Sequence, residues 1–187
     1  MITAFLDANV LYPPTLRSVL LELAHADLYA ALWSDEVHRE WMRSLAENRP
    51  TLPTAAIMRM RALMEAHIGD VSVRGYEPLI ATLTLPDPDD RHVLAAAIHG
   101  KASVIVTSNL KDFLPEVLAP HQIIAQHPDA FVLSLLEADA EGVAMALAAD
   151  RADLVNPPLS VDEYLAVLER GGLPETANAL LQLKDLL

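Results

Sequence analysis

The chain of 187 residues contains no cysteine, so it forms no disulfide bond and holds no metal ion through thiolates. It also has no uninterrupted apolar stretch of the roughly 18 residues that a membrane helix needs. The apolar run Ile2–Leu6 is too short for the core of a signal peptide, and no basic segment precedes it. These absences lead us to expect a protein of the cytoplasm that does not associate with membranes.

Basic residues are scarce, since 13 Lys and Arg stand against 26 Asp and Glu, a net charge of −13. This balance argues against a protein that binds nucleic acid through a large positive surface. The charge is also uneven, because residues 1–127 hold 10 basic and 15 acidic side chains whereas residues 128–187 hold 3 and 11. If four acids of the first part bind a metal ion, that part is nearly neutral and local contacts to RNA remain possible there.

Apolar runs alternate with segments of helical spacing through the first two thirds of the chain. Strands are expected at Ile2–Leu6, Leu28–Trp33, Val71–Val73, Val104–Thr107 and Gln122–Ala125. Helices are expected to begin at Pro13–Pro14, after the N-cap Ser34, at Pro53 and at Asp87, the last one ending at Gly100. This alternation predicts an α/β fold with a mostly parallel central sheet flanked by helices.

Only helices are expected in the last third of the chain. They cover about Asp129–Ala149, follow a capping box formed by Ser160 and Glu163, and begin again at Pro174. A helical unit of this size is marginal by itself. We therefore predict an α/β domain of residues 1–127 and a small all-helical C-terminal extension of residues 128–187, which stabilises the domain or binds a partner.

Two acidic residues stand just beyond predicted strands. Asp7 directly follows the first strand, and Asp112 follows the strand Val104–Thr107 after a loop of four residues. Ligands of a parallel α/β sheet bind outside the carboxyl ends of its strands, so both side chains can reach such a site. A turn or cap role, helped by Asn9, is the alternative for Asp7.

Two further acids are ambiguous when each is taken alone. Glu40 lies about two turns into the helix after Ser34, where the local pattern favours a solvated acid paired with Arg43. Asp90 lies three residues after Asp87, which is an ordinary capping arrangement at the start of a helix. No single acid decides the function.

Four sequence segments carry these acids, and their order along the chain is part of the pattern. They are Phe5–Leu11, Trp33–Glu40, Pro86–Ala97 and Val106–Phe113. Together they resemble the PIN-domain family, and specifically the VapC-like toxins of bacterial toxin–antitoxin pairs, over roughly the first 130 residues. The stretch Leu168–Pro174 is similar to the C-terminal helical extension of one subgroup of these toxins.

The resemblance implies that residues 1–127 form a PIN-like nuclease domain that acts as a metal-dependent endoribonuclease. Carried over residue by residue, it makes four carboxylates the catalytic and metal-binding site, namely Asp7, Glu40, Asp90 and Asp112. The implied cofactor is Mg²⁺ or Mn²⁺, because hard oxygen ligands suit these ions. The implied partners are an RNA substrate, a cognate antitoxin protein and, through the apolar faces of Ala30–Leu32 and Thr54–His67, a second copy of the chain.

Auxiliary residues flank these acids. Asn109 stands where many members of the family have a further Asp, which leaves open whether one or two metal ions bind. Thr107 and Ser108 are candidates for orienting the scissile phosphate or a metal-bound water, and Asn9 is a candidate for holding Asp7. The basic residues next to proposed ligands are candidate contacts to RNA phosphates, namely Arg39, Arg91 and Lys111.

The residue types agree with metal-assisted chemistry. Four carboxylates in one pocket repel one another and raise some of their pKa values unless a cation is present. A divalent ion relieves this repulsion, activates water for attack on phosphorus and neutralises charge on the leaving oxygen. The seven histidines show no spacing typical of a zinc site.

Two other functions stay open at the level of sequence. A catalytically silent PIN-like module that binds RNA or protein would bind no Mg²⁺ or Mn²⁺, and the presence of all four acids speaks against it. An aspartyl-phosphate hydrolase would also place Asp7 at the end of the first strand. Such enzymes generally carry a second acid two residues later, where this chain has Asn9.

Overall fold

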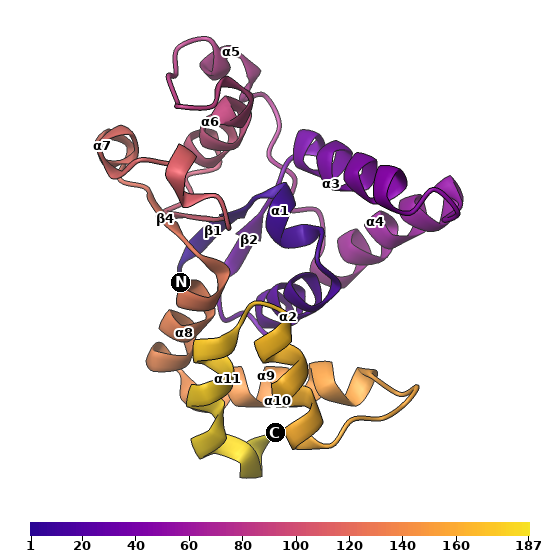
Figure 1. The fold of residues 1–187 in the computed structure, drawn as a ribbon. Coiled ribbons are helices and arrows are strands. Elements are labelled where there is room, and N and C mark those ends of the chain that lie inside the picture. The colour runs from indigo at the N-terminus through magenta and orange to yellow at the C-terminus, as the bar shows by residue number, and fades with distance from the viewer.

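A four-stranded sheet lies at the centre of the computed structural model, which describes residues 1–187 (Figure 1). The strands are β1 (Thr3–Leu6), β2 (Ala30–Leu32), β3 (Val104–Val106) and β4 (Ile124–Gln126), in the spatial order β2-β1-β3-β4. All three pairings are parallel. The predicted α/β fold with a parallel sheet is therefore confirmed. The fifth candidate strand, Val71–Val73, forms only an isolated bridge from Ser72 to Trp33.

Helices surround this sheet and then continue alone to the C-terminus. They are α1 (Ala8–Leu11), α2 (Pro14–His25), α3 (Asp35–Asn48), α4 (Thr54–Ile68), α5 (Glu77–Ile80), α6 (Arg91–His99), α7 (Pro115–Leu118), α8 (Pro128–Ala138), α9 (Ala140–Asp153), α10 (Val161–Arg170) and α11 (Pro174–Leu180). Short 3-10 turns are η1 (Pro88–Asp90), η2 (Leu110–Asp112), η3 (Ala119–His121) and η4 (Leu181–Leu186). None of these helices has the length and apolar character to cross a membrane.

The core is built on the two central strands. Residues 4–6 of β1 and all of β3 are buried, as expected for parallel strands that are covered on both faces. Helix α6 packs on both strands and contributes the small buried residues Ala95, Ala96 and Ala97, whose size allows a close approach to the sheet. Tight packing there fixes the start of α6, and with it Asp90, relative to the ends of β1 and β3.

The C-terminal helices α8 to α11 gather at one end of the molecule, where α9 packs on α2, which also contacts β2 (Figure 1). The predicted capping box of Ser160 and Glu163 is present at the start of α10. The single helix predicted over about Asp129–Ala149 is wrong, because α8 ends at Ala138 and a new helix follows. Asp139 leaves the helical conformation (φ −149°, ψ 83°), and its side chain caps α9 by accepting from the Gly142 N–H at 2.9 Å.

Candidate metal centre

Asp7 stands at the end of β1, where the sheet and a short helix both fix it. Its backbone N–H donates to the Val106 carbonyl at 3.1 Å, which continues the pairing with β3 by one residue. Its side chain caps α1 by accepting from the Ala8 N–H at 2.6 Å, and also accepts from the Thr107 hydroxyl at 2.7 Å. Only 4% of Asp7 is exposed. Burial raises the pKa of this carboxyl, and the hydrogen bonds from Thr107 and Ala8 oppose that shift.

The polar residues beside Asp7 form a network of hydrogen bonds with it and with one another. Asn9 Nδ2 donates to Asp7 Oδ2 at 2.5 Å and to Thr107 Oγ1 at 2.9 Å, while Asn9 Oδ1 accepts from the Ser108 N–H at 2.9 Å. Thr107 Oγ1 also accepts from the Asn109 N–H at 3.0 Å. Because the Thr107 hydroxyl donates to Asp7, its role in this structure is to orient that carboxylate. Asn9 both holds Asp7 and ties it to the loop after β3.

Glu40 points from α3 toward α6. Its Oε1 lies 3.0 Å from Nε2 of His92, and His92 is 8% exposed. Burial lowers the pKa of His92, but the hydrogen bond and the charge of Glu40 outweigh it, so the net shift is upward. Glu40 makes no ion pair with Arg43, the partner that local spacing favoured. His92 thus fixes Glu40 at the site, a role that nothing in the local sequence indicates.

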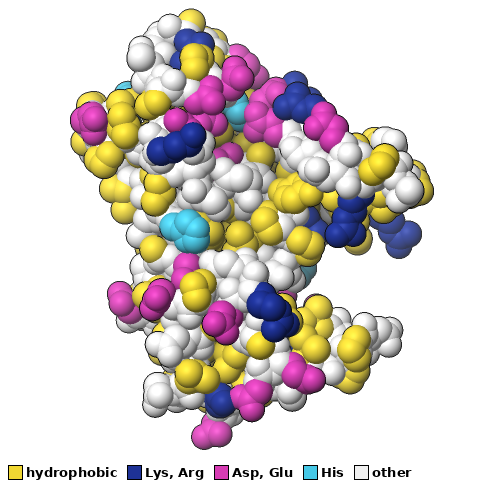
Figure 2. Space-filling model, viewed as in Figure 1, with side chains coloured by type: hydrophobic (Ala, Val, Ile, Leu, Met, Phe, Trp, Pro, Cys, Tyr) yellow, Lys and Arg dark blue, Asp and Glu magenta, His cyan; other side chains and the backbone are white.

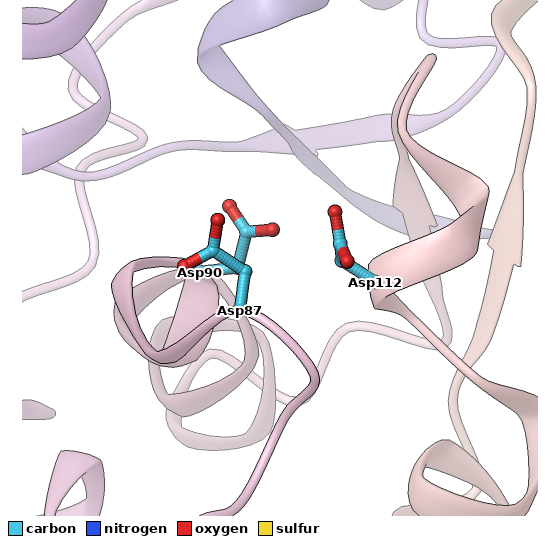
Figure 3. A group of neighbouring side chains, drawn as sticks. All are labelled: Asp87, Asp90 and Asp112. Atoms are coloured by element: carbon cyan, nitrogen blue, oxygen red, sulfur yellow. The ribbon is translucent and has the colours of Figure 1, made fainter.

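A second group of acids forms where the start of α6 faces η2. Carboxylate oxygens of Asp87, Asp90 and Asp112 lie within 4.8 Å of one another. Figure 3 shows Asp87 and Asp90 on the turn that begins α6, with Asp112 facing them from η2. Asp87 also accepts from the Asp89 N–H at 2.9 Å, so the capping role predicted for it is present. Its membership of the acidic group was not predicted, although three acids within Asp87–Asp90 were a visible signal.

Asp90 connects this group with the other two acids. It shares a pocket of about 490 Å³ with Asp7 and Glu40, while its Oδ2 accepts from Asn109 Nδ2 at 3.2 Å. Burial raises the pKa of Asp90 to about 6, and the carboxylates of Asp7, Asp87 and Asp112 add to this shift. Hard oxygen donors that repel one another in this way fit a divalent cation, which would relieve the repulsion. The four acids singled out from the sequence therefore lie at one edge of the sheet, with Asp7 and Glu40 outside the closest trio.

The pocket joins elements that are distant in the sequence. Its lining residues are Asp7, Ala8, Asn9, Tyr12, Glu40, Trp41, Arg43, Ser44, Asn48 and Asp90. Figure 2 shows acidic side chains gathered over the region where the α6 end of the molecule meets α3. Glu40 and Asp90 are partly exposed, so the pocket is in contact with solvent.

The basic residues chosen from the sequence lie around this pocket without lining it. Arg39 pairs with Glu36 at 2.6 Å, Arg91 Nε donates to the Pro88 carbonyl at 2.9 Å, and Lys111 Nζ is 3.8 Å from Asp112. Lys111 is extended into solvent, its side chain 84% exposed. The basic residue that does line the pocket is Arg43.

We expect Asp90→Asn to stabilise the metal-free protein at neutral pH. The folded-state pKa of about 6 exceeds the ordinary value of 3.8, so this group's stabilising contribution is full below pH 3.8 and is lost as the pH rises through 6. Asn cannot ionise, and its carbonyl can still accept from Asn109. In EDTA at pH 7 the midpoint of thermal unfolding should rise by a few degrees, and the gain should vanish near pH 4.

With added Mn²⁺ the parent should have the higher midpoint of thermal unfolding. A ligand that binds only the folded state stabilises the parent more than a variant with a weakened site. A variant that is less stable than the parent in EDTA at pH 7 would contradict the expected repulsion at Asp90.

Comparisons with known proteins agree with the geometry. Residues 3–111 match the family described as PIN domain, and residues 128–182 match the family described as VapC50 C-terminal domain. A protein of Mycobacterium tuberculosis named "Putative ribonuclease VapC50" is 40% identical over 94 residues, which are 50% of this chain and 55% of that protein. The chain thus spans about half the length of this curated relative. No solved structure matches significantly. The chain belongs to the PIN-domain family and carries a C-terminal domain of the VapC50 type.

Proposed function

We propose that this protein is a Mg²⁺- or Mn²⁺-dependent endoribonuclease, the toxin of a toxin–antitoxin pair. The observation that carries the proposal is the placement of Asp7, Glu40, Asp90 and Asp112 at the carboxyl edge of the sheet of a PIN domain. The name of the M. tuberculosis relative, "Putative ribonuclease VapC50", supports the same activity. Residues 1–127 would then be the nuclease domain and residues 128–187 its helical extension.

The four carboxylates would hold the cation, with Asp87 close enough to join them. A divalent ion bound there supplies a Lewis acid for the phosphoryl oxygens and a water of lowered pKa. The protein's own contribution is to fix its donors before substrate arrives. Thr107 and Asn9 hold Asp7, His92 holds Glu40, and the Asn109 amide holds Asp90. Asn109 brings no charge of its own, which favours fewer bound cations than a site with a further Asp.

A cleavage assay with defined metal content tests the function. Purified protein should cut total RNA with Mn²⁺ or Mg²⁺, stop when EDTA is added, and resume when Mn²⁺ is supplied in excess. The sequencing of RNA ends after brief induction in cells would identify the target. RNA binding without any cleavage at any metal concentration would instead favour the catalytically silent module.

The proposed partners follow from the same assignment. A cognate antitoxin would restrain the nuclease in the cytoplasm. Two copies of the chain would pair through the apolar faces of Ala30–Leu32 and α4, and α4 exposes 60% of Met58 and 59% of Leu63. Two large apolar side chains exposed on one helix are consistent with burial in a contact between chains.

We expect sedimentation equilibrium at micromolar concentration to give twice the chain mass of 20.4 kDa. Replacing Met58 and Leu63 of α4 by Lys should shift the protein toward the monomer, because two charges would enter an apolar contact. Glu47→Lys, on an exposed position of α3, serves as a charge-changing control. A parent chain that sediments as a monomer would contradict the proposed dimer.

A further inference from the structure

The pocket that holds Asp7, Glu40 and Asp90 continues along one side of α3, and this second part has a different chemistry. Its residues there are Arg43, Ser44 and Asn48, which we call the α3 wall. We propose that the α3 wall is a subsite for one unpaired nucleotide next to the scissile phosphate of an RNA substrate. This inference rests on the proposed nuclease function and adds the side chains that contact the nucleotide beside the cut.

The spacing of these residues makes a continuous surface. Arg43, Ser44 and Asn48 follow Glu40 by three, four and eight positions, so all four share one face of the helix. With a rise of about 1.5 Å per residue, the wall extends roughly 12 Å from the acidic end of the pocket. A chain whose phosphate lies at the carboxylates would therefore pass along these side chains.

Arg43 is the single basic residue that lines the pocket, and its guanidinium makes no ion pair or hydrogen bond with the protein. A phosphate approaching several carboxylates in a protein of net charge −13 needs a cation close by. Arg39 lies one turn earlier on the same helix, but it is paired with Glu36 and stays outside the pocket. The geometry therefore assigns the phosphate contact to Arg43.

The other two residues of the wall offer groups that can read a base. Asn48 Nδ2 donates to the Ser44 carbonyl at 2.9 Å, which leaves the Asn48 amide oxygen and the Ser44 hydroxyl without a protein partner. Tyr12, half-buried in the same pocket, offers an aromatic ring. Hydrogen bonding to base edges together with stacking is how proteins recognise unpaired RNA, since the edges are already paired in a duplex.

Binding to a labelled single-stranded RNA and to its duplex tests the subsite without requiring cleavage. In an Asp7→Asn background, Arg43→Gln should weaken binding to the single strand severalfold. It should also make the negative slope of log K against log salt less steep by about 0.7. Arg39→Gln is the matched control and should change both quantities much less. The duplex should bind more weakly than the single strand. Equal effects of the two arginine variants, or tighter binding to the duplex, would overturn the proposal.

Mapping of cleavage sites gives a second, independent readout. With Asp7 restored, Ser44→Ala and Asn48→Ala should change which nucleotide is found beside the cut, whereas Arg39→Gln should not. An unchanged distribution in both alanine variants would overturn the base-reading role. If the parent cuts no RNA but the Arg43 effect on binding persists, the nuclease function fails and the subsite stands. If the parent cuts RNA and the two arginine variants behave alike, the subsite fails and the function stands.

Discussion

Asp7→Asn should lower the rate of RNA cleavage by roughly three orders of magnitude, about 4 kcal/mol on the chemical step. The substitution keeps the shape of the side chain but removes one negative charge from the proposed donors of the cation. Both metal affinity and the stabilisation of transition-state charge should fall. Binding of RNA should survive or tighten, because the repulsion between this carboxylate and phosphate disappears.

The fold should survive this change through two opposing effects. Neutralising Asp7 removes the cost of a buried carboxylate, whose pKa is raised by burial. An amide, however, has one oxygen for the three donors that Asp7 serves, which are the Ala8 N–H, Asn9 Nδ2 and the Thr107 hydroxyl. We expect these effects to offset each other within about 1–2 kcal/mol, as circular dichroism and urea unfolding would show.

Asp89→Asn is the appropriate control for this experiment. Asp89 is exposed on the same turn as Asp87 and Asp90, but its carboxylate is outside the acidic group. Asp87, which the sequence assigned to capping alone, is unsuitable because the structure places it within that group. Cleavage that stays at the parent rate in purified Asp7→Asn protein, and that EDTA still abolishes, would exclude Asp7 as a ligand needed for catalysis.

Asp129→Ala should lower the free energy of unfolding by about 2–4 kcal/mol, because it removes the hydrogen bonds between α8 and the start of α11. Asp129 is 5% exposed and accepts from the Glu175 N–H at 2.9 Å, the Thr176 N–H at 2.9 Å and the Thr176 hydroxyl at 2.7 Å. These N–H groups belong to the first turn of α11, where no carbonyl of the helix itself can accept from them. Alanine would leave both N–H groups without this partner, and that of Thr176 is buried at the positive end of the helix.

Urea unfolding followed by circular dichroism measures this loss. Asp129→Asn should cost less than Asp129→Ala, because the amide oxygen keeps part of the network. Asp162→Ala is a control in the same extension, since Asp162 lies in an exposed ion pair with Lys184 at 2.5 Å, and such pairs contribute at most about 1 kcal/mol. If Asp129→Ala lowered the free energy of unfolding no more than Asp162→Ala, the hydrogen bonds from α11 to Asp129 would not stabilise the extension.

The sequence by itself determined the elements and the family. Apolar runs and helical spacing are properties of neighbouring residues, so they predicted four of the strands, the N-cap at Ser34 and the capping box at Ser160. The order of the acid-bearing strings predicted the PIN domain. The spacing of apolar residues wrongly predicted a single helix across Asp139. A run of apolar and small residues does not reveal that the Asp139 side chain caps a new helix.

Only the tertiary structure decided which polar side chains meet. Glu40 pairs with His92 across 52 positions in the sequence, and the packing of α3 and α6 around the sheet creates that contact. The same packing brought Asp87 into the acidic group and placed Arg43, not Arg39, in the pocket. Asp129 reaches the first turn of α11 in the same way, across 47 positions. Such contacts depend on the relative placement of whole elements, which is set by the packing of the core and leaves no periodic signal near any one of the residues involved.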